Sequence, residues 1–400
     1  MLIGLVGKTN TGKSTFFKAA TLAEVEISNR PFVTIKPNHA IGFLKIECVD
    51  KEFNTKCKPK EGFCINNFRF IPFDLLDVAG LIKDAHLGKG LGNQFLDDLR
   101  QADAFIHIVD ISGSTDEHGN SIEPLTYNPE KDIEFLEHEL DMWYYQILKK
   151  GWEKFARTVQ QENQDIKRAL AKQLSGLKVT EDDVQDCIKI LKLLHSPTEW
   201  KDSELQDLAS LLRKKTKPMI IAANKIDIEG SLYNFDKIKE KFNYVIIPCS
   251  AESELALREA HKNKLIEYIP GSKDFKLTEL GKRNLNEKQI NALNFIKKNV
   301  LDKYEKGTGV QEILNYIVFS LLNYISVFPV SNSHLEDSKG NKLPDCLLIN
   351  KNSTALDLAF KLHTDIGNNF IRAIDLKTKQ VVGKDHILKH RDVIEIIVRK

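Results

Sequence analysis

Residues 7–14 have the types and spacing of a phosphate-binding loop. The stretch GKTNTGKS fits the pattern GxxxxGK[ST] and lies between an apolar run, 2–6, and a helix-compatible segment, 15–22. Glycines at 7 and 12 let successive backbone NH groups point at one anion, and the dipole of the following helix adds positive potential. Lys13 would then reach the outer phosphates, and the Ser14 hydroxyl would ligate Mg²⁺. The other residues expected in this phosphate cradle are Lys8, Asn10, Thr11, Gly12 and Thr15.

A second motif, DxxG, ends the run FDLLDVAG at 73–80. Asp77 is placed to hold Mg²⁺ through water, and the NH of Gly80 to meet a γ-phosphate. Between the two motifs, the stretch RPFVTIKPN contains Thr34, which we expect to reach the same metal when a third phosphate is present. Lys13 and Gly80 are therefore the groups expected to stabilise charge on a transferring phosphoryl group.

The stretch AANKID at 222–227 follows the apolar run PMII and predicts a base-recognition loop. Asp227 offers two carboxylate oxygens to the ring NH and exocyclic amine of guanine, whereas adenine would leave the carboxylate unpaired. That mismatch costs about 1–3 kcal/mol. We expect Asn224 to tie this loop to the phosphate loop and the stem of Lys225 to lie over the base. The run YVIIPCSA, 244–251, ends in Ser250 and Ala251, whose NH groups are expected to meet the guanine carbonyl.

The elements that position these motifs are five continuous apolar runs, which are typical of a parallel sheet covered on both faces. Each motif stands at the carboxyl end of a run, where open α/β sheets bind ligands. The runs are LIGLVG, FRFIPFDLLDV, AFIHIVDI, PMIIAAN and YVIIPCSA.

The interval between DVAG and NKID is too long for one βα unit, which indicates an insertion after Asp110. Apolar residues at helical spacing form three stripes, and these favour an antiparallel helical arm with charged outer faces. Thr180 with Asp183 resembles a capping box. A solvated face and a binding surface both fit the mixed charges of the arm. The stripes are Ile133, Leu136, Leu140, Trp143 or Tyr144, and Ile147; Val184, Ile188, Leu191 and Leu194; and Leu205, Leu208, Leu211 and Leu212, which run into the basic segment RKKTK.

From about residue 325 the pattern changes to short strands around one helix, TALDLAFKLH, which suggests a β-grasp module. Thr354 with Asp357 resembles a capping box for that helix. Basic residues here could meet phosphates, although their number also suits any soluble surface. They include Lys361, Arg372, Lys377, Lys379 and Arg391.

Composition narrows the class of protein. A chain of 400 residues predicts more than one domain, and we expect a nucleotide-binding domain in two parts, 1–120 and 217–322, the second with a helical connector. A helical insertion at 121–216 and a β-grasp domain at 323–400 complete the division. The net charge of +2 predicts no global attraction to nucleic acid or membrane, so any RNA-binding surface must be local.

Cysteine usage and hydropathy indicate a soluble, cytoplasmic protein. The cysteines at 48, 57, 64, 187, 249 and 346 lack the CxxC spacing of a zinc site, and we expect them to be reduced packing residues. No apolar run is long enough to span a bilayer, and the start MLIGLVG predicts a first strand rather than a signal peptide.

With these motifs in place, the chain resembles the Obg-related translation-factor GTPases, and within them the YchF subgroup, over essentially its whole length. The resemblance implies an α/β fold: a P-loop G domain with an inserted antiparallel coiled-coil arm and a C-terminal β-grasp domain of the TGS type. It also implies a nucleotide-dependent switch on the ribosome or its RNA, bound through the arm and the TGS domain. The residues that carry it are GKTNTGKSTFF, RPFVTIKPN, DVAGLIKDAHLGKGLGNQFL, LPDCLLINKNSTALDLAFKLHTDIGNNFIRAID and VVGKDHILKHRDVIEI.

The activity expected from this resemblance is slow, Mg²⁺-dependent hydrolysis of GTP to GDP and phosphate. The sequence does not fix the oligomeric state, for which a monomer is the expectation. Many YchF members replace the lysine and aspartate of the base loop and prefer ATP, but this chain keeps Asn224, Lys225 and Asp227, which favours GTP. Two alternatives stay open. One is an ATPase of the same subgroup, and the other is a ribosome- or RNA-binding module that GTP gates without appreciable hydrolysis.

One departure concerns the attacking water, because Leu81 follows DxxG where Ras-like proteins carry a water-orienting Gln. His86 and His118 are candidates to replace it, and the resemblance places a catalytic His in the loop SGSTDEHGN; a merely solvated His118 is the alternative. His107 lies within an apolar run and is interpreted as a core residue whose hydrogen bonds are satisfied. Asn10 stands where related GTPases with the pattern GxxNxGKS coordinate K⁺, although a loop also tolerates Asn without that role.

Overall fold

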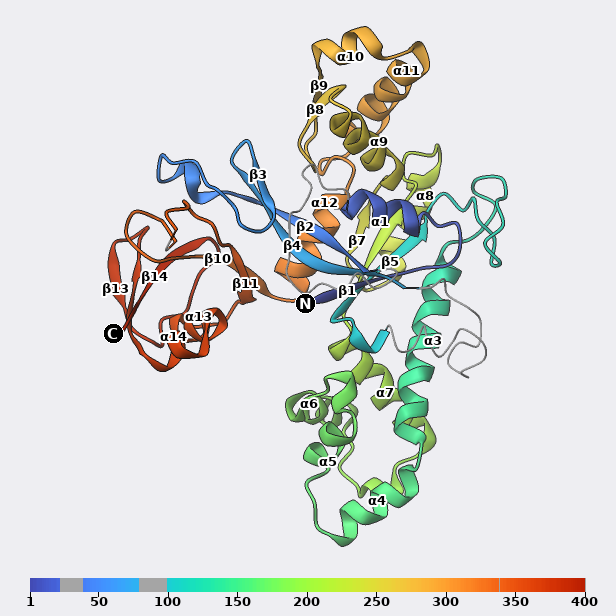
Figure 1. Ribbon diagram of the computed structural model, residues 1–400. Coiled ribbons are helices and arrows are strands. Elements are labelled where there is room, and N and C mark those ends of the chain that lie inside the picture. The colour runs from blue at the N-terminus through green and yellow to red at the C-terminus, as the bar shows by residue number, and fades with distance from the viewer. Residues whose placement is uncertain (22–38, 79–98, 338, 400) are drawn as a thin grey trace.

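The computed structural model describes residues 1–21, 39–78, 99–337 and 339–399 (Figure 1). Thr34, Gly80, Leu81 and His86 lie outside these residues. In the described part, a central sheet domain carries a helical arm on one side and a separate C-terminal domain on another (Figure 1). None of the described helices combines the length and the hydropathy that crossing a bilayer requires.

The central domain is built on a seven-stranded sheet of order β2-β4-β1-β5-β6-β7, with β3 paired to β4. Five of its strands are parallel neighbours, as the apolar runs predict. They are β1 (Leu2–Val6), β4 (Phe68–Asp77), β5 (Ala104–Asp110), β6 (Met219–Asn224) and β7 (Ile246–Pro248). The two remaining strands, β2 (His39–Glu47) and β3 (Phe63–Ile65), run antiparallel to β4.

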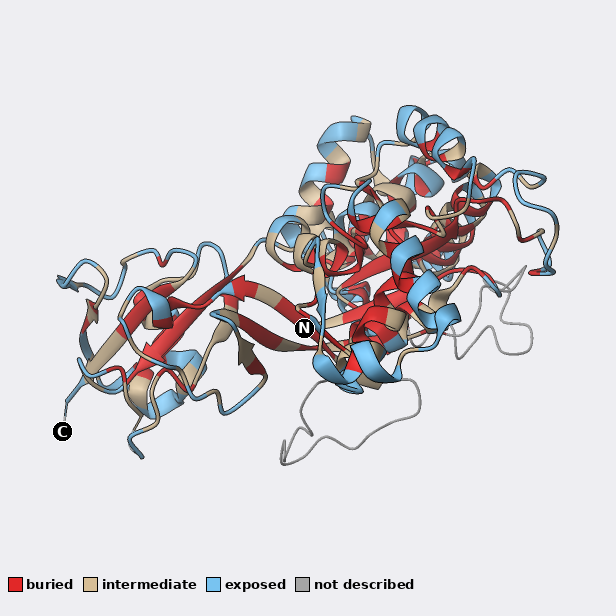
Figure 2. Ribbon diagram, turned by 90° about the horizontal axis from the view of Figure 1, so that it is seen from above, coloured by how far each residue is buried: buried red, intermediate tan, exposed pale blue. Residues whose placement is uncertain are grey.

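Apolar side chains from alternate positions of these strands enter two separate cores. Ile3 and Leu5 belong to one cluster, and Val6 belongs to the other. All residues of β5 and β6 are buried, and Figure 2 shows such buried strands running through the centre of the domain. The helices that connect these strands include α1 (Lys13–Thr21) and α8 (Ser231–Lys241), and α9 (Ala251–Lys262) follows β7.

The arm is formed by α3 (Glu130–Lys149), which leads away from the sheet, and α7 (Asp202–Thr216), which returns (Figure 1). Three shorter helices close its far end: α4 (Trp152–Gln161), α5 (Ile166–Gln173) and α6 (Glu181–Leu191). The capping box of Thr180 is confirmed. The sequence predicts that Leu194 continues the apolar stripe of this helix. This expectation is wrong, because α6 ends at Leu191 and Leu194 is 91% exposed.

A second group of helices leads from the sheet to the C-terminal domain. It begins with a small hairpin, β8 (Ile266–Tyr268) and β9 (Phe275–Leu277), followed by α10 (Glu279–Asn284) and α11 (Glu287–Ile296). The following helix, α12 (Val310–Asn315), is buried against β2 and α1, and π-helical turns at Lys297–Leu301 and Tyr316–Leu321 flank it. The last part of this connector, α12 and the turn after it, therefore belongs to the core of the central domain.

The C-terminal domain is a five-stranded sheet of order β11-β10-β14-β12-β13, consistent with the predicted β-grasp. Its helix α13 (Ala355–Leu362) starts with the predicted capping box at Thr354, and the short α14 (Thr364–Asn368) follows. The expectation that Lys377 and Arg391 are free for phosphates is wrong, because both pair with Glu52 of the central domain. The strands are β10 (Tyr324–Val330), β11 (Leu347–Asn350), β12 (Phe370–Asp375), β13 (Gln380–Val382) and β14 (Asp392–Val398).

Candidate nucleotide-binding site

The loop between β1 and α1 has a tightly curled backbone. Gly7, Asn10 and Gly12 have φ of 155°, 63° and 92°. A Cβ added at Gly7 would lie 2.6 Å from the Ile108 carbonyl oxygen, and one at Gly12 would lie 2.2 Å from Asn224 Nδ2. These two positions therefore accept only glycine. The NH of Phe16 donates to the Gly12 carbonyl at 2.8 Å, so α1 begins directly after the loop.

Lys13 and Asp77 meet at the carboxyl ends of two adjacent strands. Leu5 of β1 is the register partner of Asp77 in β4, and Lys13 Nζ lies 2.5 Å from Asp77 Oδ1. Ser14, the next residue of α1, is exposed. A hydroxyl and a carboxylate are the hard oxygen ligands that Mg²⁺ prefers, with water filling its other positions. The donor types of Ser14 and Asp77 therefore fit this metal.

The side chains of Lys8 and Thr11 turn into the protein. Lys8 Nζ donates to the Thr115 carbonyl at 2.9 Å and to Asp132 Oδ1 at 3.0 Å, and it lies 3.8 Å from the centroid of the Tyr127 ring. Thr11 Oγ1 donates to the Lys8 carbonyl at 3.1 Å. The Lys8 ammonium therefore supports neighbouring segments, and the expected contact of Lys8 with the nucleotide stays a prediction. Only the backbone of these two residues is left to face a phosphate.

Asn224 joins the base loop to the phosphate loop and to the start of α9. Its Nδ2 donates to the Thr11 carbonyl at 2.8 Å, which confirms the predicted tie, and its Oδ1 accepts from the NH of Ala251 at 3.0 Å. The NH of Ser250 donates to the Thr308 carbonyl at 2.9 Å. Both NH groups thus have partners within the protein, and their expected contact with the guanine carbonyl stays a prediction.

A cavity of about 260 Å³ lies between the base loop and the phosphate loop. Lys225 reaches Asp110 Oδ2 with its ammonium, at 2.9 Å, and its stem is part of the lining. Among the described residues, none donates a hydrogen bond to the carboxylate of Asp227, which is partly exposed in the same cavity. The lining consists of Gly12, Thr15, Asn224, Lys225, Asp227, Ile228, Ser250 and Glu252.

Asp110, at the end of β5, is a supporting residue that the sequence motifs do not reveal. Besides Lys225, it accepts hydrogen bonds from the hydroxyls of Ser112 at 2.5 Å, Ser114 at 2.9 Å and Thr115. Burial alone would raise the pKa of Asp110, but the hydrogen bonds from Ser112, Thr115 and Lys225 lower it below the usual value. The available signal was a carboxylate that ends a wholly apolar run and is followed by hydroxyl residues.

The loop after β5 packs on the phosphate loop and carries His118. Asn10 Nδ2 donates to the Gly119 carbonyl at 2.7 Å, and a Cβ at Gly119 would lie 2.7 Å from Thr9 Cβ. The His118 side chain is 77% exposed and lies 3.5 Å from Glu117. The structure thus brings this loop, though not the imidazole itself, against the phosphate loop. Asn10 Oδ1 is the amide atom left for K⁺, and that role stays a prediction.

The helices of the insertion begin later in the chain than the sequence predicts. The segment 111–129 supports the phosphate loop through residues such as Thr115 and Tyr127, so the inserted helices begin at Glu130 rather than at residue 121.

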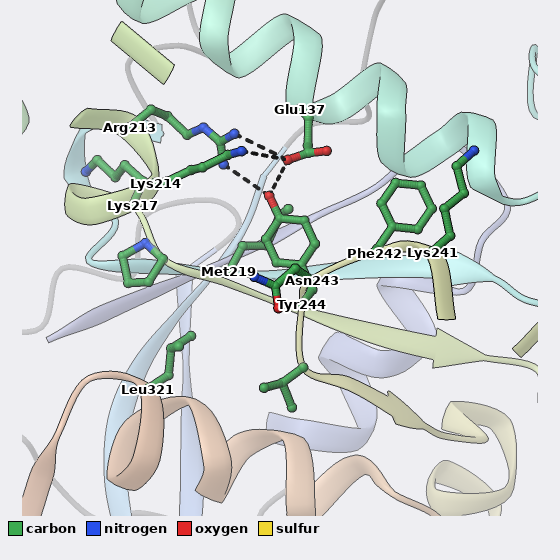
Figure 3. Close-up of a pocket in the computed structure, with 12 residues that line it drawn as sticks. Glu137, Arg213, Lys214, Lys217, Met219, Lys241, Phe242, Asn243, Tyr244 and Leu321 are labelled. Atoms are coloured by element: carbon green, nitrogen blue, oxygen red, sulfur yellow. Dashed lines mark hydrogen bonds and ion pairs between the residues drawn. The ribbon is translucent and has the colours of Figure 1, made fainter. Parts of the chain in front are cut away.

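Another cavity, of about 500 Å³, lies at the amino ends of β6 and β7 (Figure 3). Arg213, which is 1% exposed, donates from Nε to Asp141 Oδ1 at 2.7 Å, and Lys241 pairs with Glu130 and Glu134. Arg213 and Lys241 therefore have acidic partners on α3, whereas Lys217 donates to the carbonyls of Arg100 and Ala102. Parallel sheets bind ligands at the opposite, carboxyl ends of their strands, so the cavity beside Asp227 is the nucleotide site candidate.

Comparison with known proteins agrees with this assignment. The family model of 50S ribosome-binding GTPases matches residues 2–139. The model of the Obg-like GTPase YGR210-like, G4 motif-containing domain matches 222–332, and the TGS domain model matches 339–398. A GTP-binding protein of Methanocaldococcus jannaschii is 48% identical over 398 residues, which cover 99% of this chain and 98% of that protein.

Two further relatives bear on the nucleotide and on the fold. The ribosome-binding ATPase YchF of Buchnera aphidicola is 28% identical over 386 residues, covering 94% of this chain and 88% of that protein. The crystal structure of a GTP-binding protein from Pyrococcus horikoshii matches with a TM-score of 0.77 and 38% identity, covering 100% of both chains.

Proposed function

The chain belongs to the Obg-like GTPases, in their YchF subgroup, and from this premise we propose that it hydrolyses GTP to GDP and phosphate as a nucleotide-dependent switch on the ribosome. The base would occupy the cavity beside Asp227, and the phosphates would follow the loop at residues 7–14.

The observation that carries the choice of guanine is the state of Asp227. Its neighbours Asn224 and Lys225 are bound within the protein, whereas its own carboxylate lines the cavity without a donor among the described residues. A carboxylate in this position gains hydrogen bonds from the ring NH and exocyclic amine of guanine. With adenine, the carboxylate would lose its hydration without gaining these hydrogen bonds.

Lys13 supports hydrolysis as the cation aimed at the outer phosphates. Ser14 and Asp77 are the described residues that would hold Mg²⁺, which when bound neutralises charge on the phosphate oxygens. Lys13 and Asp77 are already in contact, so a nucleotide would have to divide this ion pair and give each charge a new partner. His118 stands as the candidate for orienting water, because its loop packs on the phosphate loop.

The test measures binding of GTP, ATP and XTP by calorimetry to the wild type, Asp227→Asn and the control Asp236→Asn. Asp236 is an exposed carboxylate on the adjoining helix α8. We expect the wild type to bind GTP more tightly than ATP or XTP. Asp227→Asn should weaken GTP binding by about 1–3 kcal/mol and strengthen XTP binding, because an amide can donate to the carbonyl that replaces the guanine amine. Asp236→Asn should leave all three affinities unchanged.

Two results would contradict this proposal. Unchanged GTP affinity in Asp227→Asn would remove Asp227 from the base site. Equal or tighter wild-type binding of ATP would favour the ATPase activity that names the Buchnera relative.

A further inference from the structure

Three cysteines and one aspartate converge outside the nucleotide site, at the end of the sheet formed by β2, β3 and β4. Cys48 follows β2, Asp50 lies in the 3-10 turn Val49–Lys51, Cys57 lies in the next loop and Cys64 lies in β3. One ligand atom from each residue falls in a group whose members all lie within 4.8 Å of one another. The spacing of these residues along the chain has no CxxC pair, so folding alone creates the cluster.

The distances in the cluster fit a tetrahedral metal better than a disulfide. Cys48 Sγ lies 3.6 Å from Cys57 Sγ, and Cys64 Sγ lies 3.9 Å from Asp50 Oδ2. A disulfide would require about 2.05 Å between sulfurs. Tetrahedral zinc with Zn–S bonds of about 2.3 Å places neighbouring sulfurs about 3.8 Å apart.

The backbone around the cluster is held independently of any metal. Asn66 and Asn67, both with positive φ, form the turn between β3 and β4, and the Asn67 carbonyl accepts from the NH of Cys48 at 2.7 Å. Asn67 Nδ2 also donates to Asp50 Oδ1 at 3.2 Å. This bond orients the carboxylate and leaves Oδ2 toward the sulfurs, which is how residues behind a metal ligand commonly act.

We propose that Cys48, Asp50, Cys57 and Cys64 form a structural zinc site. On binding, each thiol releases its proton to solvent and its sulfur donates an electron pair to zinc, with no change of oxidation state. Four protein ligands close the tetrahedron, so the site has a structural role and no open position for substrate.

The zinc would order the surface on which the C-terminal domain docks. Directly after Cys57, the NH of Lys58 donates to the Lys342 carbonyl at 2.8 Å, and that of Lys60 donates to the Pro344 carbonyl at 3.0 Å. Arg69, 1% exposed, donates to the carbonyls of Leu343 and Pro344 at 3.2 and 2.7 Å. The loop that carries the ligand Cys57 therefore also makes contacts between the domains.

The experiment measures metal content of the full chain, purified without chelators, by plasma mass spectrometry. We expect one zinc per chain, and about a tenfold or greater loss in Cys57→Ser and Cys64→Ser. Cys187→Ser, which removes a buried cysteine of the arm, should keep the full zinc content. Asn67→Ala should weaken zinc affinity by about 10- to 100-fold while retaining the site.

A second measurement applies to the wild type even if the variants fail to fold. Anaerobic titration of the zinc-free, reduced chain with Co²⁺ should produce the intense visible bands of tetrahedral thiolate coordination, and zinc should abolish them. Removing zinc should also speed amide exchange at Lys58 and Lys60. Absence of both zinc in the purified chain and Co²⁺ uptake would overturn the site, as would a disulfide between two of its cysteines in protein isolated anaerobically. Unchanged exchange at Lys58 and Lys60 would overturn its role in docking.

Discussion

At the scale of single residues, two buried polar groups of β5 have opposite roles. Asp110 is charged and satisfied by hydroxyls and the Lys225 ammonium. His107 is 1% exposed, and its Nδ1 has no hydrogen-bond partner among the described residues. Burial, with a smaller contribution from the charge of Lys8, lowers the pKa of His107 to about 3. The predicted core position of His107 is therefore confirmed, but the expectation that its hydrogen bonds are satisfied is wrong for Nδ1.

His107 predicts a dependence of stability on pH. The pKa of His107 is near 6.5 in the unfolded chain and about 3 in the folded one. The stability of the folded protein is therefore fully present above pH 6.5, and the titration of His107 lowers it as the pH falls below that value. Only the unfolded state then takes up the proton, so the free energy of unfolding should fall by up to about 1.4 kcal/mol per pH unit.

Urea denaturation between pH 6.5 and 5 measures this slope. The variant His107→Gln should reduce it, while His118→Gln, at an exposed loop position, should leave it unchanged. Equal slopes in the wild type and His107→Gln would show that His107 is protonated in the folded protein.

At the scale of elements, the site depends on how three loops are joined. Asn224, at the end of β6, bonds to the loop before α1 and to the first turn of α9. The start of α9 is held in turn by buried Glu254, which accepts from Thr308 Oγ1 at 2.5 Å and Tyr268 Oη at 2.7 Å. The base loop and phosphate loop are therefore one connected structure.

We expect Asn224→Ala to destabilise the protein by about 2–6 kcal/mol, because it leaves the Thr11 carbonyl and the Ala251 NH buried without partners, at about 1–3 kcal/mol each. Affinity for GTP, ATP and XTP should fall together, unlike the change of preference expected for Asp227→Asn.

Urea denaturation and calorimetry give the two readouts for Asn224→Ala. Asn299→Ala is the matched control, because the half-buried Asn299 side chain donates only to the Phe295 carbonyl of its own turn, and it should change stability by less than about 0.5 kcal/mol. A shift toward XTP in Asn224→Ala would show that this amide contacts the base directly.

At the scale of the whole molecule, the C-terminal domain is anchored by charge as well as by backbone contacts. The Glu52 carboxylate forms ion pairs with both Lys377 and Arg391. These two cations therefore face the central domain rather than an external partner. Lys361, Arg372 and Lys379 remain exposed. If this domain contacts ribosomal RNA, these three are among the exposed cations available for it.

We expect ribosomes to stimulate GTP hydrolysis at least about tenfold above a slow intrinsic rate, because Leu81 cannot orient water and a partner must complete the site. Replacing Lys361, Arg372 and Lys379 together by Glu should lower this stimulation and leave the intrinsic rate unchanged. Phosphate release in Mg²⁺, with K⁺ or Na⁺, is the measurement, and Lys13→Ala is the inactive reference.

The matched control for the triple variant replaces Lys262, Lys276 and Lys288, which are equally exposed but lie in and around the connector. Absence of any ribosome effect on the wild type would favour a GTP-gated binding module over a ribosome-activated enzyme.

Much of the nucleotide site could be read from short stretches of sequence. The phosphate loop, Asp77 and Asp227 follow from local rules, because glycines at set positions and polar residues after apolar strands act through neighbouring backbone geometry. The parallel sheet and both threonine-capped helices were predictable for the same reason.

Packing between distant segments decided the rest. Which polar groups stay free depends on partners far away in the chain, as with Lys8 and Asp132, Ser250 and Thr308, or Arg391 and Glu52. Periodicity carries no information on such long-range hydrogen bonds and ion pairs. The cluster of Cys48, Asp50, Cys57 and Cys64 arises in the same way, because the β3–β4 turn and the loop after β2 must fold together before their side chains meet.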